Sequence, residues 1–404
     1  MRALPLAVCL LVASASPLVA QHRDAAGLPR RPALPYGSDS CDAYAYYQYG
    51  LAHLRGDPAS AAAAFYWTHR LSPDAAVAYY AERVALLLAD ERLLSGYMEE
   101  DRRTLQSPEV RRIDSLQVRA LTIDPFFAEQ LDEILVVTYY TNAIHDEYRQ
   151  HGEEVSPVDI EFYVRRALAD AGPGMRAWLA FGRGDYQLAA GLWAGEERRH
   201  KKNADLRFWR SRALYLMGQP DSARVELDSA LAVARRSDAE TMRYAYDSKV
   251  LWEYQVGRIH EVRGRDGEAR DAYQRALVED LSFEPAHVRL AYIAMRSADT
   301  ANALTELRRA VEIREDDYAA RLLFGTVLAS RRDTAAAGEQ LRRAAEIEPW
   351  VPQPHLVLGD LLDVAGDRAG AIAEYRRFVA LAASRDRDLA AVRERLSALG
   401  APPE

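Results

Sequence analysis

The residues closest to a known catalytic motif stand at 260–264, which read H-E-V-R-G. A zinc-protease helix needs a second histidine four residues after the first, and Gly264 occupies that place. One ligand is therefore missing, and we interpret Glu261 as a side chain that faces solvent or a groove. His145 and His151 are six residues apart, which places them on different faces of a helix. The sequence therefore predicts no metal site.

Nucleophilic and phosphate-binding motifs are also missing. The sequence contains no G-x-S-x-G motif and no phosphate-binding loop, and we interpret residues 182–184 as a helix turn, not a dinucleotide fingerprint. Of the two cysteines, Cys9 lies in a predicted signal, which leaves Cys41 without an intramolecular partner. We interpret Cys41 as a passive buried residue, with an intermolecular bridge or a reactive thiol as the alternative. We expect no catalytic residue and no cofactor.

The first 20 residues have the pattern of a secretory signal. Arg2 precedes an apolar run, and small residues end it at Ala20, before the polar Gln21. This pattern predicts cleavage after Ala20, with an uncut signal anchor as the alternative. No later stretch is long and apolar enough to span a membrane. We therefore expect an exported protein, periplasmic or secreted, and the Ala/Arg-rich composition suggests a bacterial envelope.

The bulk composition fits a large folded protein with an acidic surface. Its 404 residues are 49% hydrophobic and 28% charged, which allows a sizeable core. The formal net charge is −8, whereas a general nucleic-acid binder needs a basic face to displace phosphate counterions. We therefore expect no nucleic-acid partner.

Small and large residues recur at a fixed interval in the second half of the chain. Alanines stand at 189, 223, 269, 303, 337 and 371, at spacings of 34, 46, 34, 34 and 34. Four residues after each alanine stand Trp193, Leu227, Tyr273, Leu307, Leu341 and Tyr375. Twelve residues before the last four alanines stand Gly257, Ala291, Gly325 and Gly359. Small residues let two helices approach closely and the large residue fills the groove between them, so the columns predict stacked helix pairs.

This pattern resembles the tetratricopeptide repeat, whose 34-residue unit reads W-x2-L-G-x2-Y, then A-x3-F, then P. Residues 322–325, Ala337, Leu341 and Pro349 carry it well. The resemblance implies an all-α fold, a right-handed α-solenoid of helix pairs with a divergent helical N-terminal half and a C-terminal capping helix. The predicted units are 170–203, 204–237, 250–283, 284–317, 318–351 and 352–385. An ordinary helical bundle is the alternative, although a bundle has no reason to keep this interval.

The remaining segments are assigned around these units. We predict a signal at 1–20, a flexible Pro-rich leader at 21–41, divergent tetratricopeptide-like hairpins at 42–169, an insertion at 238–249, and a capping helix and tail at 386–404. Within the divergent part, Gly50, Ala62 and Tyr66 trace one more unit, and residues 126–150 predict one long helix. Ser237 followed by Glu240 is a capping-box pattern, so we expect the insertion to extend the next helix, which then runs to about Val262.

In tetratricopeptide proteins the first helix of each pair lines a concave surface. Carried over by position, the residues that face this groove include Phe208, Arg212, Tyr215, Tyr254, Arg258, Tyr292 and Arg296. The resemblance thus implies a ladder of arginine and tyrosine that suits an acidic or aromatic peptide, because arginine forks onto carboxylates and tyrosine offers flat contact area. A merely solvated inner face is the alternative. We expect alanine at all three arginines to weaken partner binding and to leave the fold intact.

These observations favour an exported, non-enzymatic scaffold that binds a protein or peptide partner through its concave groove. A structural subunit of an envelope or outer-membrane assembly is one alternative. An unrecognised enzymatic activity in residues 42–169 is another, and it would need a polar cluster in a pocket there. The sequence names neither the partner nor the oligomeric state.

Overall fold

The computed structural model describes residues 28–128, 130–200, 203–236 and 248–401, and over these the chain forms 21 helices. The prediction of an all-α solenoid of paired helices is confirmed. The predicted signal and most of the predicted insertion lie outside the described residues. None of the described helices is long and apolar enough to cross a membrane.

Eight helices make up the N-terminal part. They are α2 (Ala43–His53), α3 (Pro58–Leu71), α4 (Ala76–Leu88), α5 (Glu91–Met98), α6 (Arg102–Leu105), α7 (Pro108–Ile123), α8 (Asp132–Gln150) and α9 (Pro157–Asp170). α2 and α3 pack as a pair, α3 packs on α4 and α4 on α7, whereas α8 contacts α5, α9 and α10. This part therefore contains one repeat-like pair followed by helices without a fixed period.

Six helix pairs and a terminal helix make up the rest. The pairs are α10 (Pro173–Gly182) with α11 (Tyr186–Arg199), α12 (Ala204–Leu216) with α13 (Pro220–Arg236), α14 (Lys249–Val262) with α15 (Asp266–Glu279), α16 (Glu284–Arg296) with α17 (Thr300–Ile313), α18 (Tyr318–Ser330) with α19 (Thr334–Ile347), and α20 (Gln353–Val364) with α21 (Arg368–Leu381). The terminal helix α22 (Leu389–Ala398) packs on α21 and buries Leu389, Val392 and Leu396. Each helix pair also contacts the next, so the pairs stack into one array.

The columns of small residues mark where the paired helices touch. All six alanines of the repeated column have no exposed surface. A Cβ atom on Gly325 would lie 2.6 Å from Cγ of Leu341, and one on Gly359 would lie 2.5 Å from the ring of Tyr375. Only glycine fits at these two crossings, because the large side chain of the second helix occupies the space of a Cβ.

The turns inside the pairs repeat at the same spacing as the alanines. Each pair has, in its turn, one residue in the left-handed region, with φ between 57° and 80°. In successive pairs these residues are Gly184, Gly218, Gly264, Ala298, Arg332 and Gly366. In four pairs the next residue is an aspartate that caps the second helix by accepting the backbone N–H three residues on: Asp185, Asp299, Asp333 and Asp367. One left-handed residue followed by an aspartate cap reverses the chain sharply and starts the second helix.

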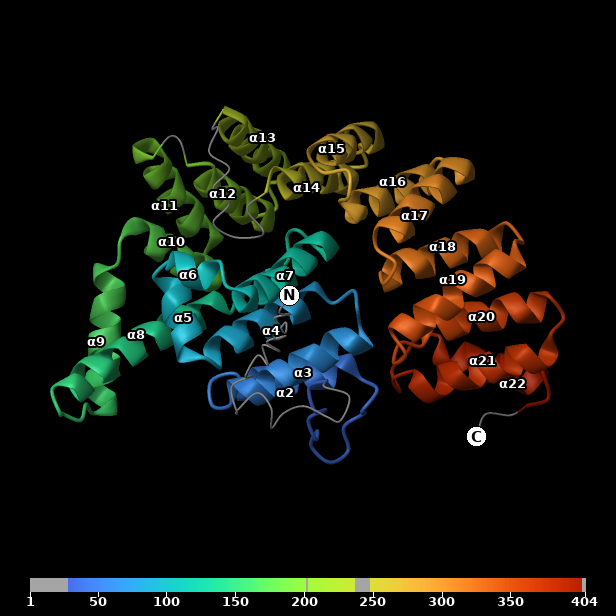
Figure 1. Ribbon diagram of the computed structural model, residues 1–404, viewed down its shortest axis with the longest axis horizontal. Helices are drawn as coiled ribbons and strands as arrows, with labels where there is room; N and C mark the ends of the chain where they lie inside the picture. The colour runs from blue at the N-terminus through green and yellow to red at the C-terminus, as the bar shows by residue number, and fades with distance from the viewer. Residues whose placement is uncertain (1–27, 129, 201–202, 237–247, 402–404) are drawn as a thin grey trace, which may run out of the picture.

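The array curls around the N-terminal helices, so that α10 to α22 form an arc with α2, α3, α4 and α7 inside it (Figure 1). Residues far apart in the sequence meet across this arrangement. The rings of Trp67 and Trp350 meet edge to face with centroids 4.9 Å apart, and Arg70 pairs with Glu348 at 2.9 Å. The concave side of the array is therefore packed against its own N-terminal part.

Near the chain start, this packing includes part of the segment predicted as a flexible leader. The guanidinium of Arg31 lies over the rings of Tyr46 and Trp67, at 5.1 and 4.9 Å from the centroids. The indole of Trp67 donates a hydrogen bond to the carbonyl of Pro29 at 2.9 Å. Pro29 and Arg31 thus contact the helices, and the flexibility of the leader at 21–41 stays a prediction.

Two predicted helix starts are wrong. α14 begins at Lys249, because Ser248 caps it by accepting the N–H of Leu251 at 3.2 Å, so it does not continue a helix from residue 237. It ends at Val262, as predicted. α8 begins at Asp132, not at residue 126, because Pro125 and Phe127, which precede it, bind the concave side of the array.

Candidate functional site

The concave side of the array holds a stretch of the chain itself, residues 122–127, which we call the inner segment. α7 ends at Ile123, and Asp124 is extended with φ −134° and ψ 100°. Pro125 explains this ending, since the residue before a proline is disfavoured in the helical region. The carboxylate of Asp124 then accepts the N–H of Phe126 at 3.0 Å, which fixes a local turn.

Arg212 on α12 binds the inner segment through two backbone carbonyls. Its Nη1 donates to the carbonyl of Pro125 at 2.5 Å and its Nη2 to the carbonyl of Phe127 at 3.1 Å. The side chain has no exposed surface, and its guanidinium lies over the rings of Phe127 and Trp209. The fork expected for a carboxylate is thus used on two peptide carbonyls, whose burial would otherwise be costly.

Two further groove residues bind the same segment on α14. The hydroxyl of Tyr254 donates to the carbonyl of Thr122 at 2.7 Å, and Nη1 of Arg258 donates to the carbonyl of Ile123 at 3.0 Å. Burial raises the pKa of Tyr254, so its hydroxyl remains a donor at neutral pH. These bonds reach backbone atoms and therefore do not depend on which side chains the segment carries.

One side chain of the inner segment is recognised directly. The ring of Phe126 stacks on that of Tyr215 with centroids 3.7 Å apart and planes at 15°. Phe126 is 5% exposed, so the contact is buried. Four of the seven predicted groove residues thus bind the inner segment: Arg212, Tyr215, Tyr254 and Arg258.

The other three predicted groove residues do other things. Phe208 has no exposed surface and stacks on Trp252 of the next pair with centroids 5.5 Å apart, so it belongs to the core. Tyr292 is 36% exposed at the rim of the groove. Arg296 pairs with Asp266 at 2.8 Å. The seven residues therefore do not form one open ladder, and whether a separate peptide contacts any of them stays a prediction.

Glu261, in the metalloprotease-like stretch, is held by basic side chains. Arg289 donates two hydrogen bonds of 2.8 Å to its carboxylate, Arg296 a third of 3.0 Å, and the hydroxyl of Tyr273 also donates to it. The side chain is 5% exposed, so the expectation that it faces solvent is wrong, whereas its partner Arg289 lies on the concave side. Among the described residues no group of three or more His, Cys, Asp or Glu is placed to hold a metal ion.

Beside the inner segment the concave side keeps an open cleft of about 660 Å³. It lies between the turn after α3, the end of α7, and the first helices of the later pairs α16, α18 and α20. Arg119 crosses it from α7 to pair with Asp317 at 2.9 Å. Burial and the neighbouring Asp317 raise the pKa of Glu284 to about 7. Tyr292 lines it from α16 and Thr326 from α18.

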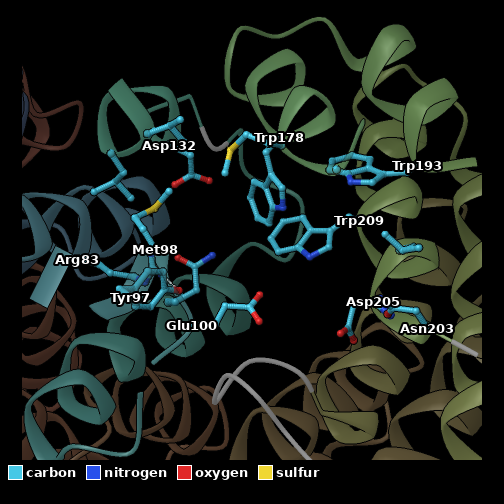
Figure 2. A pocket seen from close by; sticks show the side chains of 16 residues that line it. Arg83, Tyr97, Met98, Glu100, Asp132, Trp178, Trp193, Asn203, Asp205 and Trp209 are labelled. Atoms are coloured by element: carbon cyan, nitrogen blue, oxygen red, sulfur yellow. Dashed lines mark hydrogen bonds between the residues drawn. The ribbon is translucent and has the colours of Figure 1, made fainter. Parts of the chain in front are cut away.

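A second cavity, of about 370 Å³, separates the N-terminal helices from the first array pairs, and we call it the tryptophan cavity. Trp178, Trp193 and Trp209 line it from α10, α11 and α12. Figure 2 shows these indole rings on one side and Asp132 with Met98 on the other. The size is typical of small-molecule sites, which are concave and mostly apolar.

Charged groups at the tryptophan cavity are mainly acidic. Glu100, Asp132 and Asp205 contribute carboxylates, and Arg83 contributes the one guanidinium among its lining residues. Arg83 is buried, and it interacts with Asp114 at 3.4 Å and with the hydroxyl of Tyr97. Arg83 is therefore held by partners within the wall of the cavity.

Sequence reasoning missed both of these features. The sequence does carry a signal for the tryptophan cavity, because three of its six tryptophans fall within residues 178–209. The position of the inner segment has only a weak signal, the Asp-Pro pair at 124–125.

Cys41 is a free and partly buried thiol. Its Sγ lies 3.9 Å from the carbonyl oxygen of Ala380, and burial raises the pKa of the thiol.

Comparisons with known proteins give structural likeness only. No family model and no curated protein matches the chain. Among solved structures, the chain is similar to YrrB, described as a tetratricopeptide protein with an unusual peptide-binding site, at 22% identity over 52% of this chain and 100% of that one, with a TM-score of 0.40. It is also similar to PilF of Pseudomonas aeruginosa, at 15% identity over 57% of this chain and 99% of that one, TM-score 0.43. A third is MamA of Desulfovibrio magneticus, at 18% identity over 44% and 94%, TM-score 0.38.

The fold is defined by the chain's own helix packing. The interval of 34 residues, the glycines under large side chains and the repeated turn define it. The array consists of tetratricopeptide-type helix pairs. The functions of the similar proteins are not transferred to this chain by the likeness.

Proposed function

We propose that this chain is an exported, non-enzymatic scaffold that binds a protein or peptide partner on the concave side of its tetratricopeptide-type array. The observation that carries the proposal is the inner segment. The concave side already binds polypeptide, mainly through backbone carbonyls, with Arg212, Tyr254 and Arg258 as donors. A surface that recognises backbone atoms suits peptides of varied sequence.

The partner would use the part of the concave side that the inner segment leaves open. The cleft of about 660 Å³ offers Arg289 and Tyr292, whose guanidinium and ring lie 4.8 Å apart. Aromatic and arginine side chains of this kind contribute most of the energy at many protein interfaces. Export remains part of the proposal because the signal pattern at residues 1–20 supports it.

Site-specific photocrosslinking tests the proposed surface. A photoreactive phenylalanine derivative in place of Tyr292 should crosslink a discrete protein in intact cells. The control is the same residue in place of Val278, which is 83% exposed on α15, the second helix of its pair. Crosslinks from position 278 alone, or none from position 292, would contradict binding on the concave side.

The proposed compartment has a separate test. Fractionation of cells, followed by N-terminal sequencing of the protein, should give a mature chain that begins at Gln21 outside the cytoplasm. A chain that still begins at Met1 in the cytoplasmic fraction would remove export from the proposal.

A further inference from the structure

Helix α9 is poorly covered by the rest of the chain. Of its 14 residues only Val164 is buried, and among the described residues α8 is the one helix on which it packs extensively. A cavity of about 510 Å³ lies between the two helices, so even this packing is incomplete. A helix of this length is marginal in water unless it buries an apolar face. α9 therefore offers more surface than its own chain covers.

The uncovered face of α9 is apolar. Val158, Phe162 and Tyr163 are 75%, 59% and 37% exposed, and no other described helix carries three exposed large apolar side chains. Val158, Phe162 and Ala169 follow each other at intervals of four and seven residues, so they form one stripe along the helix. Figure 1 shows α9 at the left edge of the molecule. The stripe is therefore open to a partner.

Charges on both flanks of this stripe run from acidic to basic along α9. On one flank Asp159 precedes Arg166 by seven residues, and on the other Glu161 precedes Arg165 by four. All four side chains belong to exposed residues. Within the helix Arg165 pairs with Glu161, and Arg166 lies 3.9 Å from the carboxylate of Asp170. Exposed pairs of this kind contribute little to stability, so a partner can replace them.

This order of charges fits a second, antiparallel copy of α9. In two antiparallel helices related by a two-fold axis, each flank meets the same flank of the other copy in reverse order. An axis between residues 162 and 163 sets Asp159 against Arg166 of the second copy, and Glu161 against Arg165 of the second copy. The same axis brings the two Phe162 side chains together at the centre. A parallel copy would instead set like charges side by side.

We propose that α9 is the contact surface of a homodimer, in which the α8–α9 hairpins of two copies form an antiparallel four-helix bundle. Val158 and Phe162 provide the apolar contact, and the charged pairs on both flanks fix the register. None of the residues that line the cleft on the concave side lies on α8 or α9. The dimer surface is therefore separate from the proposed peptide-binding surface and does not depend on it.

Analytical ultracentrifugation of the purified full-length protein tests for the dimer. A small interface of this kind gives a dissociation constant in the micromolar range, so the parent should change from monomer to dimer between about 1 and 100 µM. A parent that remains monomeric over this range would overturn the proposal and leave the face of α9 to a different partner.

Two identical substitutions on different helices place the contact. Val158 of α9 and Val278 of α15 are 75% and 83% exposed, so serine at either position should leave the fold intact. We expect Val158→Ser to raise the dissociation constant of the dimer at least about fivefold, and Val278→Ser to leave it unchanged. Equal dissociation constants for the two variants would contradict an interface on α9.

Disulfide formation tests the antiparallel register in a background with Cys9→Ser and Cys41→Ser. Asp159→Cys keeps the start of α9, because Ser156 still accepts the N–H of residue 159. Oxidation of an equimolar mixture of Asp159→Cys and Arg166→Cys proteins should give mainly the mixed disulfide. Either variant alone should crosslink at least about fivefold less, because equal positions of the two copies lie about 10 Å apart along the helix axis. A preference for disulfides between equal positions would indicate parallel helices and overturn the proposal.

Discussion

At the scale of single residues, Arg212 shows how burial changes the role expected of a groove position. A groove arginine was expected to be replaceable without loss of the fold. Arg212 instead has no exposed surface and satisfies two buried carbonyls of the inner segment. Its replacement should therefore affect stability as well as binding.

We predict that Arg212→Ala lowers the free energy of unfolding by about 3 kcal/mol, because it leaves two buried carbonyls without donors. Arg296→Ala should lower it by less than about 1 kcal/mol, because Arg296 and its partner Asp266 are exposed and its other partner, Glu261, keeps two hydrogen bonds from Arg289. Urea unfolding of the two variants measures the difference. Equal losses would mean that Arg212 does not hold the inner segment.

Two glutamates between the N-terminal part and the array make stability depend on pH. Burial raises the pKa of Glu348 to about 7, although Arg70 and Arg119 oppose the shift, and burial together with Asp317 raises the pKa of Glu284 to about 7. The pKa of a glutamate in an unfolded chain is about 4.3. Between these values the folded state binds more protons than the unfolded state, so the contribution of both groups to stability falls as pH rises from about 4.5 to 7.

We predict that Glu348→Gln removes part of this dependence. The stability of the variant relative to the parent should rise between pH 4.5 and pH 7 and then level off, because glutamine stays neutral throughout. Unfolding midpoints of both proteins across this range provide the measurement, and groups common to both cancel in the difference. A variant that becomes relatively less stable over the range would show that the buried carboxylate of Glu348 is favoured as an ion.

At the scale of elements, the repeated turn contains residues that its backbone does not favour. Arg332 has φ of 62° where other pairs place glycine, as at Gly366 with φ of 80°. A left-handed backbone costs a residue with a side chain about 1–2 kcal/mol, a cost that glycine avoids. Part of this advantage is offset because glycine loses more conformational freedom on folding than other residues do. The turn therefore keeps its left-handed backbone even where glycine is missing.

We predict that Arg332→Gly raises the free energy of unfolding by roughly 0.5–1 kcal/mol and that Gly366→Ala lowers it by about 1 kcal/mol. Thermal unfolding of both variants tests the pair. If Arg332→Gly destabilises the protein, the side chain of Arg332 makes a contribution that outweighs the backbone preference.

The elements also show what the sequence could and could not predict. The array was predictable because each pair places a small residue under a large one at a fixed interval, as Gly325 and Leu341 do. In α2 and α3 the same contact joins Gly50 to Phe65, not to Tyr66, because α3 begins eight residues after the glycine and the second helices of the array begin nine after theirs. A turn shorter by one residue moves the whole register.

The inner segment and the tryptophan cavity were not predictable because neither follows a local period. The helical composition after residue 125 predicts a helix from 126, whereas Pro125 and Phe127 bind Arg212 of α12 through their carbonyls and α8 begins only at Asp132. The cavity joins α4, α5 and α8 to α10, α11 and α12, whose relative placement is a property of the tertiary structure. Propensity and spacing describe single elements, and tertiary contacts override them here.

At the scale of the whole molecule, the array encloses its own N-terminal helices. Contacts such as Arg119 with Asp317 and Arg385 with Asp42 join residues 198 and 343 positions apart, so the curvature of the array is fixed by what it surrounds. An outside partner must therefore use the cleft that remains open or displace the inner segment. Both routes require the inner segment to occupy the concave side, where Arg212, Tyr254 and Arg258 bind it.

A double-mutant cycle on Phe126 and Tyr215 tests this central claim most directly. Phe126 belongs to the inner segment and Tyr215 to α12 of the array, and their rings stack. The account predicts that Phe126→Ala and Tyr215→Ala are coupled by about 0.5–1.5 kcal/mol in unfolding free energy, the value expected for a buried stacked pair. Additive effects of the two substitutions would contradict an inner segment held in the concave groove.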